Sequence, residues 1–106
     1  MTRIVRGSGN VFADLGFTDA EERQTKVRLA VAINRIVEQR ALSQVRAATI
    51  LKISQPKVSA LSNFKLAGFS VERLMTFLTA LDRDVSIVIK KKPRSRPAGR
   101  ISVIAA

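Results

Sequence analysis

The sequence predicts a small, mainly helical domain of four to five helices, followed by one C-terminal β-strand. Four stretches carry apolar residues at helical spacing, and each follows a Ser or Thr that can cap a helix. Hydrophobic residues make up 46% of the 106 residues, but Trp and Tyr are absent and Phe occurs only five times. Such a composition favours a core of packed aliphatic helices over an aromatic-rich β-sandwich. A β-branched stretch near the C-terminal end supplies the expected strand.

The first helix is expected over about residues 19–39, after an N-terminal arm at 1–17. The arm ends in the mixed segment VFADLGF, which we expect to pack on the domain. The sequence TDAE is a capping box, in which the Thr18 hydroxyl accepts a bond from a first-turn amide while Glu21 reaches back. The apolar residues at helical spacing after it are Leu29, Ile33, Ile36 and Val37.

Three shorter helices follow, each with a serine as its predicted N-cap: Ser43, Ser54 and Ser70. Pro56 falls in the first turn of the third helix, where a missing amide hydrogen costs nothing. The predicted helical domain therefore spans residues 18–83. Its expected inward-facing residues in these helices include Ala47, Ala48, Leu51, Val58, Leu61, Leu74, Phe77 and Leu78.

The segment DVSIVIK at residues 84–90 alternates β-branched residues with others, which predicts a strand. A lone strand has an exposed edge, and pairing with a second copy would cover it, so we expect a dimerisation strand. Residues 91–106 are expected to form a flexible basic tail, because KKKPRSRPAGR at residues 90–100 carries six basic residues and two prolines. Phosphate contacts, binding of a partner protein and a solvated tail without a role remain open for it.

Residue types that are absent exclude several functions. The chain has no Cys and no His, which excludes disulfides and thiolate metal sites and removes the usual general base. We therefore expect no enzyme activity, no cofactor and no metal. No apolar run reaches the roughly 18 residues of a membrane span, and the start of the chain lacks the apolar region of a signal peptide. A cytoplasmic protein without a membrane partner is expected.

The positive charge is concentrated around the two central helices. The formal net charge is +11, from 19 basic and 8 acidic residues, which points to a polyanionic partner. Residues 39–71 contain no carboxylate. Two short helices separated by Leu-Lys-Ile before Ser54 match the layout of a helix-turn-helix, although such pairs also occur as plain packing units. The acid-free surface favours DNA binding, and Gln55 is placed to bond an adenine edge.

The stretch LSQVRAATILKISQPKVSALSNFK resembles the helix-turn-helix of the XRE family, which has the lambda-repressor-like (Cro) fold. The flanking segments VFADLGF and GFSVERLMTFLTALDRDVSIVI, with the basic tail, resemble an antitoxin-like subgroup of type II toxin–antitoxin systems. The likeness covers roughly residues 11–90. It implies a homodimeric transcriptional regulator that binds a double-stranded DNA operator, represses its own operon and neutralises a toxin protein.

The resemblance also implies the DNA contacts. Gln44 would bond a phosphate, Gln55 would contact a base edge, and Asn63 and Lys65 would bind backbone phosphates. The helix-to-helix packing would rest on Ala48, Leu51, Val58 and Leu61. The full set of expected DNA-binding residues is Ser43, Gln44, Gln55, Lys57, Ser59, Ala60, Asn63 and Lys65, with Lys57, Ser59 and Ala60 on the exposed side of the recognition helix.

Three positions depart from the family pattern. Lys52 and Phe64 stand where glycine is usual, and Ser62 stands where an acidic residue is common. Lys52 must adopt a left-handed backbone or the turn must differ, and Phe64 is either strained in the same way or buried. These departures leave an alternative, a protein-interaction module whose helix-turn-helix no longer binds DNA.

Overall fold

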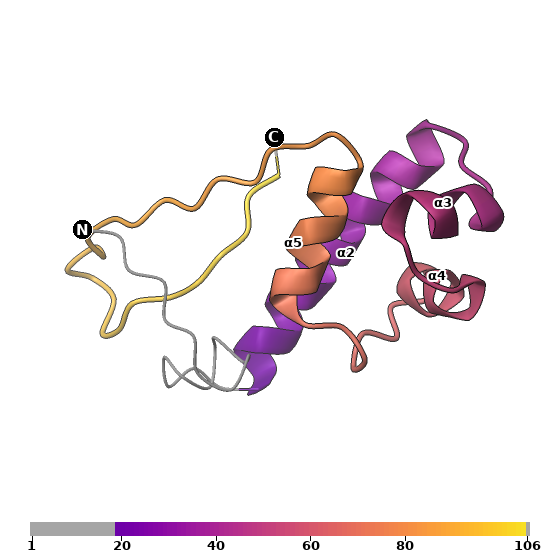
Figure 1. The fold of residues 1–106 in the computed structure, drawn as a ribbon. Helices are drawn as coiled ribbons and strands as arrows, with labels where there is room; N and C mark the ends of the chain where they lie inside the picture. Colours follow the sequence, from indigo (N-terminus) through magenta and orange to yellow (C-terminus); the bar gives the residue numbers. More distant parts are fainter. Residues whose placement is uncertain (1–18, 106) are drawn as a thin grey trace.

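The computed structural model describes residues 19–105, which contain four helices (Figure 1). They are α2 (Asp19–Gln39), α3 (Gln44–Leu51), α4 (Gln55–Ser62) and α5 (Val71–Ala80). Helix α2 packs mainly against α5, and the shorter α3 and α4 pack mainly against each other beside this pair. The prediction of a mainly helical domain with a helix-turn-helix is confirmed.

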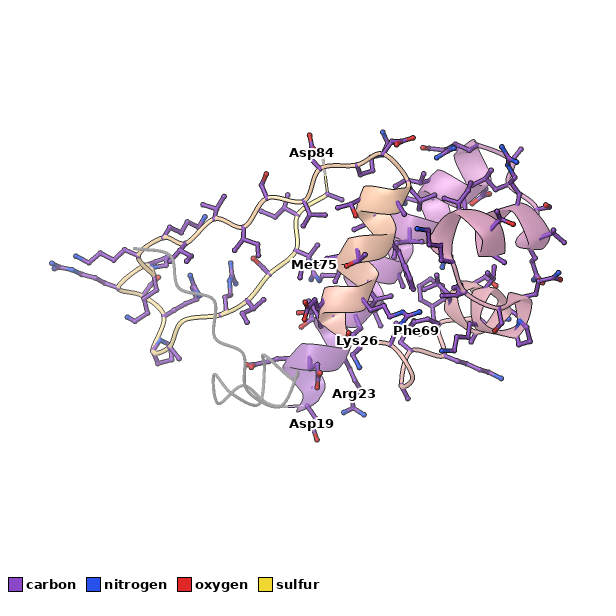
Figure 2. All side chains as sticks on the ribbon, in the orientation of Figure 1. Asp19, Arg23, Lys26, Phe69, Met75 and Asp84 are labelled. Atoms are coloured by element: carbon purple, nitrogen blue, oxygen red, sulfur yellow. The ribbon has the colours of Figure 1, made fainter. Side chains whose placement is uncertain are left out.

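The core lies mainly between α2 and α5 and extends to Leu51 of α3 and Leu61 of α4. Ile33 of α2 and Leu74 of α5 each expose 0% of their surface and belong to the same apolar cluster, as does Leu61 of α4. The rings of Phe69 and Phe77 meet edge to face, with 5.8 Å between centroids and 78° between planes, an arrangement that aromatic quadrupoles favour. Figure 2 shows Phe69 between α5 and α4, so the loop after α4 also closes the core.

The three serine caps are confirmed. Ser43, Ser54 and Ser70 all have extended backbone angles, as an N-cap requires. Each Oγ accepts a bond from the amide three residues later, over distances of 3.1, 3.4 and 3.0 Å respectively. Pro56 lies in the first turn of α4 as expected. Each short helix therefore begins at a residue whose side chain satisfies one of its free amides.

All four helices end with the same backbone motif. A residue after the helix has a left-handed backbone, and the next amide donates to the carbonyl five positions before it, as in a Schellman motif. The four left-handed residues are Ala41 (φ 51°), Lys52 (58°), Phe64 (58°) and Asp82 (64°). The bonds run from Leu42 N to Val37 O (3.0 Å), Ile53 N to Ala48 O (3.1 Å), Lys65 N to Ala60 O (2.9 Å) and Arg83 N to Leu78 O (3.0 Å). None of the four left-handed residues is glycine.

The prediction of a strand at residues 84–90 is wrong for the single chain. Residues 19–105 contain no strand, and 84–90 form an irregular segment instead. A strand is defined by hydrogen bonds to a neighbouring strand, and the described part of the chain supplies no such neighbour. The segment leaves α5, runs away from the helices and returns beyond residue 100 (Figure 1), where Val103 packs against the core. Where the segment reverses direction, the Arg96 amide donates to the Pro93 carbonyl over 3.2 Å, which closes a turn.

Two predictions concern residues outside the described range of 19–105. These are the N-terminal arm at 1–17 and the Thr18 half of the capping box. Within the range, the first turn of α2 carries the expected acidic residues Asp19, Glu21 and Glu22. Negative charge there is favourable because the N-terminus of a helix is positively polarised.

Candidate nucleic-acid interface

The turn between α3 and α4 keeps the helix-turn-helix geometry despite its lysine. Lys52 has φ 58° and ψ 45°, and its amide donates to the Ala48 carbonyl. Of the two alternatives for this position, the left-handed backbone is therefore the one observed. Ile53 follows, partly buried against the core, and Ser54 then caps α4. Three residues, 52–54, separate the helices, so the angle between α3 and α4 is set by a short, hydrogen-bonded turn.

Small and aliphatic side chains hold the two helices together. Leu51, Val58 and Leu61 are buried as predicted, and Ala47 is buried with 1% of its surface exposed. Ala48 is half-buried. Small residues on α3 allow α4 to approach closely, and this close packing fixes the position of the recognition helix.

A contact that the sequence did not reveal anchors the C-terminal end of α4. The side-chain amide of Asn34 in α2 donates to the Leu61 carbonyl over 3.2 Å. The same carbonyl also accepts from the Phe64 amide over 3.2 Å, so the Asn34 bond uses its second lone pair and ties the end of α4 to α2. The two residues are 27 positions apart, and only the folded arrangement of α2 and α4 brings them together.

Most of the expected DNA-binding side chains are on the surface. The exposed members of the set are Ser43, Gln44, Gln55, Lys57, Asn63 and Lys65. Gln55 is the first residue of α4 and Gln44 the first residue of α3, so both lie at helix N-termini, where amides point outward. Two members, Ser59 and Ala60, are only partly exposed.

The expectation for Ala60 needs correction. This residue is half-buried and packs against the apolar core cluster, so it does not lie on the exposed side of α4. The surface available for base contacts is therefore concentrated at the N-terminal end of α4, around Gln55 and Lys57.

Asn63 already has an intramolecular role. Its side-chain amide donates to the Ser59 carbonyl over 2.9 Å and lies 3.5 Å from the Ser59 hydroxyl. The bond to the carbonyl closes the C-terminal end of α4 and also fixes the orientation of the Asn63 side chain. Any phosphate contact by Asn63 must use its remaining amide hydrogen.

Helices α3 and α4 and the turn between them carry no negative side chain. No carboxylate occurs between Glu38 at the end of α2 and Glu72 in the first turn of α5. Figure 2 shows Asp19 at the far end of α2 and Asp84 in the C-terminal segment, both away from α3 and α4. Glu72 shares the lining of the hollow between α3 and α5 with Lys52, whereas the basic side chains of α3 and α4 have no acid on their own helices and can interact with phosphates. Those in this stretch are Arg40, Arg46, Lys52, Lys57 and Lys65.

Other kinds of site are poorly supported in residues 19–105. These residues contain no group of three or more acidic, His or Cys side chains that could hold a metal ion. No helix among them is long and apolar enough to cross a membrane. A hollow of about 540 Å³ between α3 and α5 is wide open to solvent, and Lys52, Arg73 and Thr76 are among its lining residues.

Comparison with known proteins agrees with this geometry. Residues 11–90 match a family described as a helix-turn-helix domain. A solved structure assigned to the XRE family of transcriptional regulators is 68% identical and superposes with a TM-score of 0.81, covering 84% of this chain and 100% of its own. No curated protein matches the chain. The fold and the site therefore define a helix-turn-helix protein. Within that class, this chain belongs to the XRE family.

Proposed function

We propose that this protein is a sequence-specific DNA-binding regulator of transcription, which inserts the N-terminal end of α4 into the major groove. The observation that carries the proposal is the exposed Gln55 at the first position of α4, within a stretch of 33 residues, 39–71, that has no carboxylate. A major groove admits an α-helix, and its base edges present patterns that side chains can distinguish.

Each end of the two helices has a separate role in this proposal. Gln55 both donates to and accepts from one adenine, and Lys57 lies beside it for a base or a phosphate. Gln44 and the first amides of α3 face a phosphate, because the N-terminus of a helix favours an anion. Lys65, after α4, neutralises a further phosphate. Since phosphates are the same in every sequence, these outer contacts position the protein and Gln55 supplies selectivity.

Direct contacts to bases are few in this arrangement. Pro56 offers no polar side-chain atom, Ala60 packs inward and Ser59 is partly covered. Base recognition therefore rests mainly on Gln55 and Lys57. We infer that the shape and deformability of the operator supply part of the specificity, as they do where a protein touches few base edges.

We also propose that the protein acts as a homodimer on a palindromic operator, through the segment 85–89. Ile87, Val88 and Ile89 expose 75%, 79% and 75% of their surfaces, which is unusual for three consecutive aliphatic residues. Burial against a second copy would remove this area from water. Two recognition helices related by a two-fold axis would then occupy half-sites about one helical turn of DNA apart.

An antitoxin role is the finer form of this proposal. It rests on the sequence resemblance, and a toxin would be a second occupant for the same exposed aliphatic segment. The alternative, a helix-turn-helix that only binds protein, drew its support from the unusual turn residues Lys52 and Phe64. Both residues adopt the left-handed backbone of a regular turn, so this reason for doubting DNA binding is weaker.

A mobility-shift assay with the DNA upstream of the protein's own reading frame tests the proposal. We expect the wild-type protein to prefer this duplex over a scrambled one. Gln55→Ala should weaken binding to the upstream duplex by about 1–3 kcal/mol and leave binding to the scrambled duplex nearly unchanged. Gln24→Ala is a matched control, because Gln24 is an exposed glutamine of α2, outside α3 and α4. Equal losses on both duplexes would contradict a base contact by Gln55.

A further inference from the structure

The turn after α4 holds an aromatic residue in a position that disfavours one. Phe64 has φ 58°, and 45% of its surface is exposed. A left-handed backbone is uncommon for any residue with a Cβ and especially so for a bulky one. A large apolar side chain with nearly half of its surface exposed to water is a second unfavourable feature. Glycine or asparagine would satisfy the same turn without either.

The other helix ends show that the turn itself does not require this ring. Ala41, Lys52 and Asp82 occupy the equivalent left-handed positions after α2, α3 and α5, and they are small or polar. All four turns make the same backbone hydrogen bond with a length between 2.9 and 3.1 Å. Phe64 also lies outside the apolar core cluster. Neither the turn nor the core therefore accounts for the aromatic side chain.

Phe64 is nevertheless held firmly in place. Its amide donates to the Leu61 carbonyl over 3.2 Å, and the next amide, of Lys65, donates to the Ala60 carbonyl over 2.9 Å. The Asn34 side chain fixes the same Leu61 carbonyl from α2. Strain persists in a folded protein only where surrounding contacts hold it, and it is concentrated at functional sites. These bonds hold the turn at Phe64, and its neighbours Asn63 and Lys65 are candidate DNA-binding residues.

Its position in the proposed complex indicates what it contacts. Asn63 and Lys65 on either side are exposed and polar, and no carboxylate lies nearby in sequence. The C-terminal end of a recognition helix approaches the DNA backbone, whereas its N-terminal residues contact base edges. The apolar groups of DNA are the sugar carbons along the backbone and the thymine methyl groups on the base edges. If this end of α4 faces the backbone, the sugar is the apolar group that we expect beside the ring.

Building on the proposed DNA binding, we propose that the Phe64 ring packs against a deoxyribose of the strand whose phosphate Lys65 neutralises. The contact fixes the register of α4 along the backbone and carries no sequence information, because every nucleotide has the same sugar. It also releases no counterion, since the ring is uncharged. The loss of this ring should therefore have a different signature from the loss of a lysine.

The test compares variants on the upstream duplex and on a scrambled duplex over a series of salt concentrations. Phe64→Gly should raise the melting temperature by relieving the backbone, yet bind both duplexes about fivefold to tenfold more weakly at every salt concentration. The slope of log affinity against log salt should stay the same. Lys65→Gln should instead reduce the magnitude of that slope by about 0.9.

Two further variants separate the ring from the backbone. Ala41→Gly relieves the same backbone conformation after α2 and should leave DNA affinity unchanged. Phe64→Asn removes the ring with a residue that tolerates the left-handed region, and it should lose the same affinity as Phe64→Gly. If Phe64→Gly and Phe64→Asn lose the same DNA affinity, the loss is caused by removal of the ring and not by the change in the backbone.

The outcomes also distinguish the sugar contact of Phe64 from the broader proposal that the protein binds DNA. Wild-type affinity of Phe64→Gly for both duplexes would overturn the sugar contact while leaving DNA binding intact. A loss confined to the upstream duplex would overturn it too, because it would indicate a base methyl instead. If the wild-type protein binds the two duplexes equally and Phe64→Gly binds both more weakly, operator preference fails and the sugar contact stands. Binding of neither duplex by the wild-type protein removes both proposals.

Discussion

The helical body at residues 19–83 and the C-terminal segment at 84–105 place their aliphatic side chains in opposite environments. In the body, Ile33 and Leu74 expose none of their surface. In the segment, Ile87, Val88 and Ile89 expose at least 75% of theirs. Apolar content is therefore not sufficient for burial. A helix satisfies its own backbone hydrogen bonds and can present one face to a core, whereas an extended segment needs a second segment for both purposes.

One chain can bury the aliphatic side chains of its helical body by itself, whereas burial of those in the C-terminal segment requires a partner. The body has a closed core and capped helix ends, so its fold depends on contacts that it supplies itself. The segment has a single residue, Val103, that packs against that core. Exposed aliphatic stretches of this kind are typical of interaction sites. Four predictions test the comparison, in order of decreasing effect.

The largest effect is expected in the body. Leu74→Ala should destabilise the domain by about 3 kcal/mol or more, because a fully buried leucine leaves a cavity when it is truncated. Ile87→Ala in the segment should change the stability of the dilute monomer by no more than about 0.5 kcal/mol. Urea unfolding followed by circular dichroism measures both. Similar losses in the two variants would show that the segment is part of the cooperative core.

The second effect concerns association. Ile87→Asp should weaken a homodimer roughly tenfold or more, because it places a charge in an apolar contact. Ser86→Asp adds the same charge at a neighbouring polar position and should have a smaller effect. Sedimentation equilibrium at matched concentrations measures the monomer–dimer ratio. If Ile87→Asp stays dimeric at the concentration where the wild type does, the interface lies elsewhere.

The third effect is local to the turn between α3 and α4. Lys52→Gly should stabilise the protein by about 1 kcal/mol relative to Lys52→Ala, since only glycine adopts φ 58° without a steric cost. Both variants lose the same charge, so their difference isolates the backbone. Thermal melting monitored by circular dichroism gives the comparison. Equal stabilities would mean that the surroundings remove the strain at Lys52.

The smallest effect on folding is expected from the tail. Deletion of residues 91–106 removes five cations and no acid, and it should leave the helical body and the operator preference intact, because such cations would contact phosphates, which carry no sequence information. For each phosphate that the tail neutralises, the deletion should reduce the magnitude of the log-affinity against log-salt slope by about 0.9. An unchanged slope would show that the tail does not bind DNA, and partner binding or simple solvation would then explain it better.

Local chemistry explains which features could be predicted from the sequence. Ser43, Ser54 and Ser70 were identifiable as caps because an N-cap bonds an amide only three residues away. The absence of acidic side chains from residues 39–71 follows directly from the order of residues. The residue type at position 52 allows either a left-handed backbone or a different turn, and the short turn between two packed helices selects the left-handed backbone.

The sequence by itself determined the four helices, their serine caps and the charge of the candidate DNA-binding surface, because these depend on neighbours along the chain. Tertiary structure alone decided that Ala60 packs inward, that Asn34 anchors the end of α4, and that residues 84–90 form no strand within one chain. Each of these depends on which groups from distant parts of the chain meet. A pattern of alternating residues indicates that a segment can form a strand, but only a partner with free hydrogen-bonding groups makes it one.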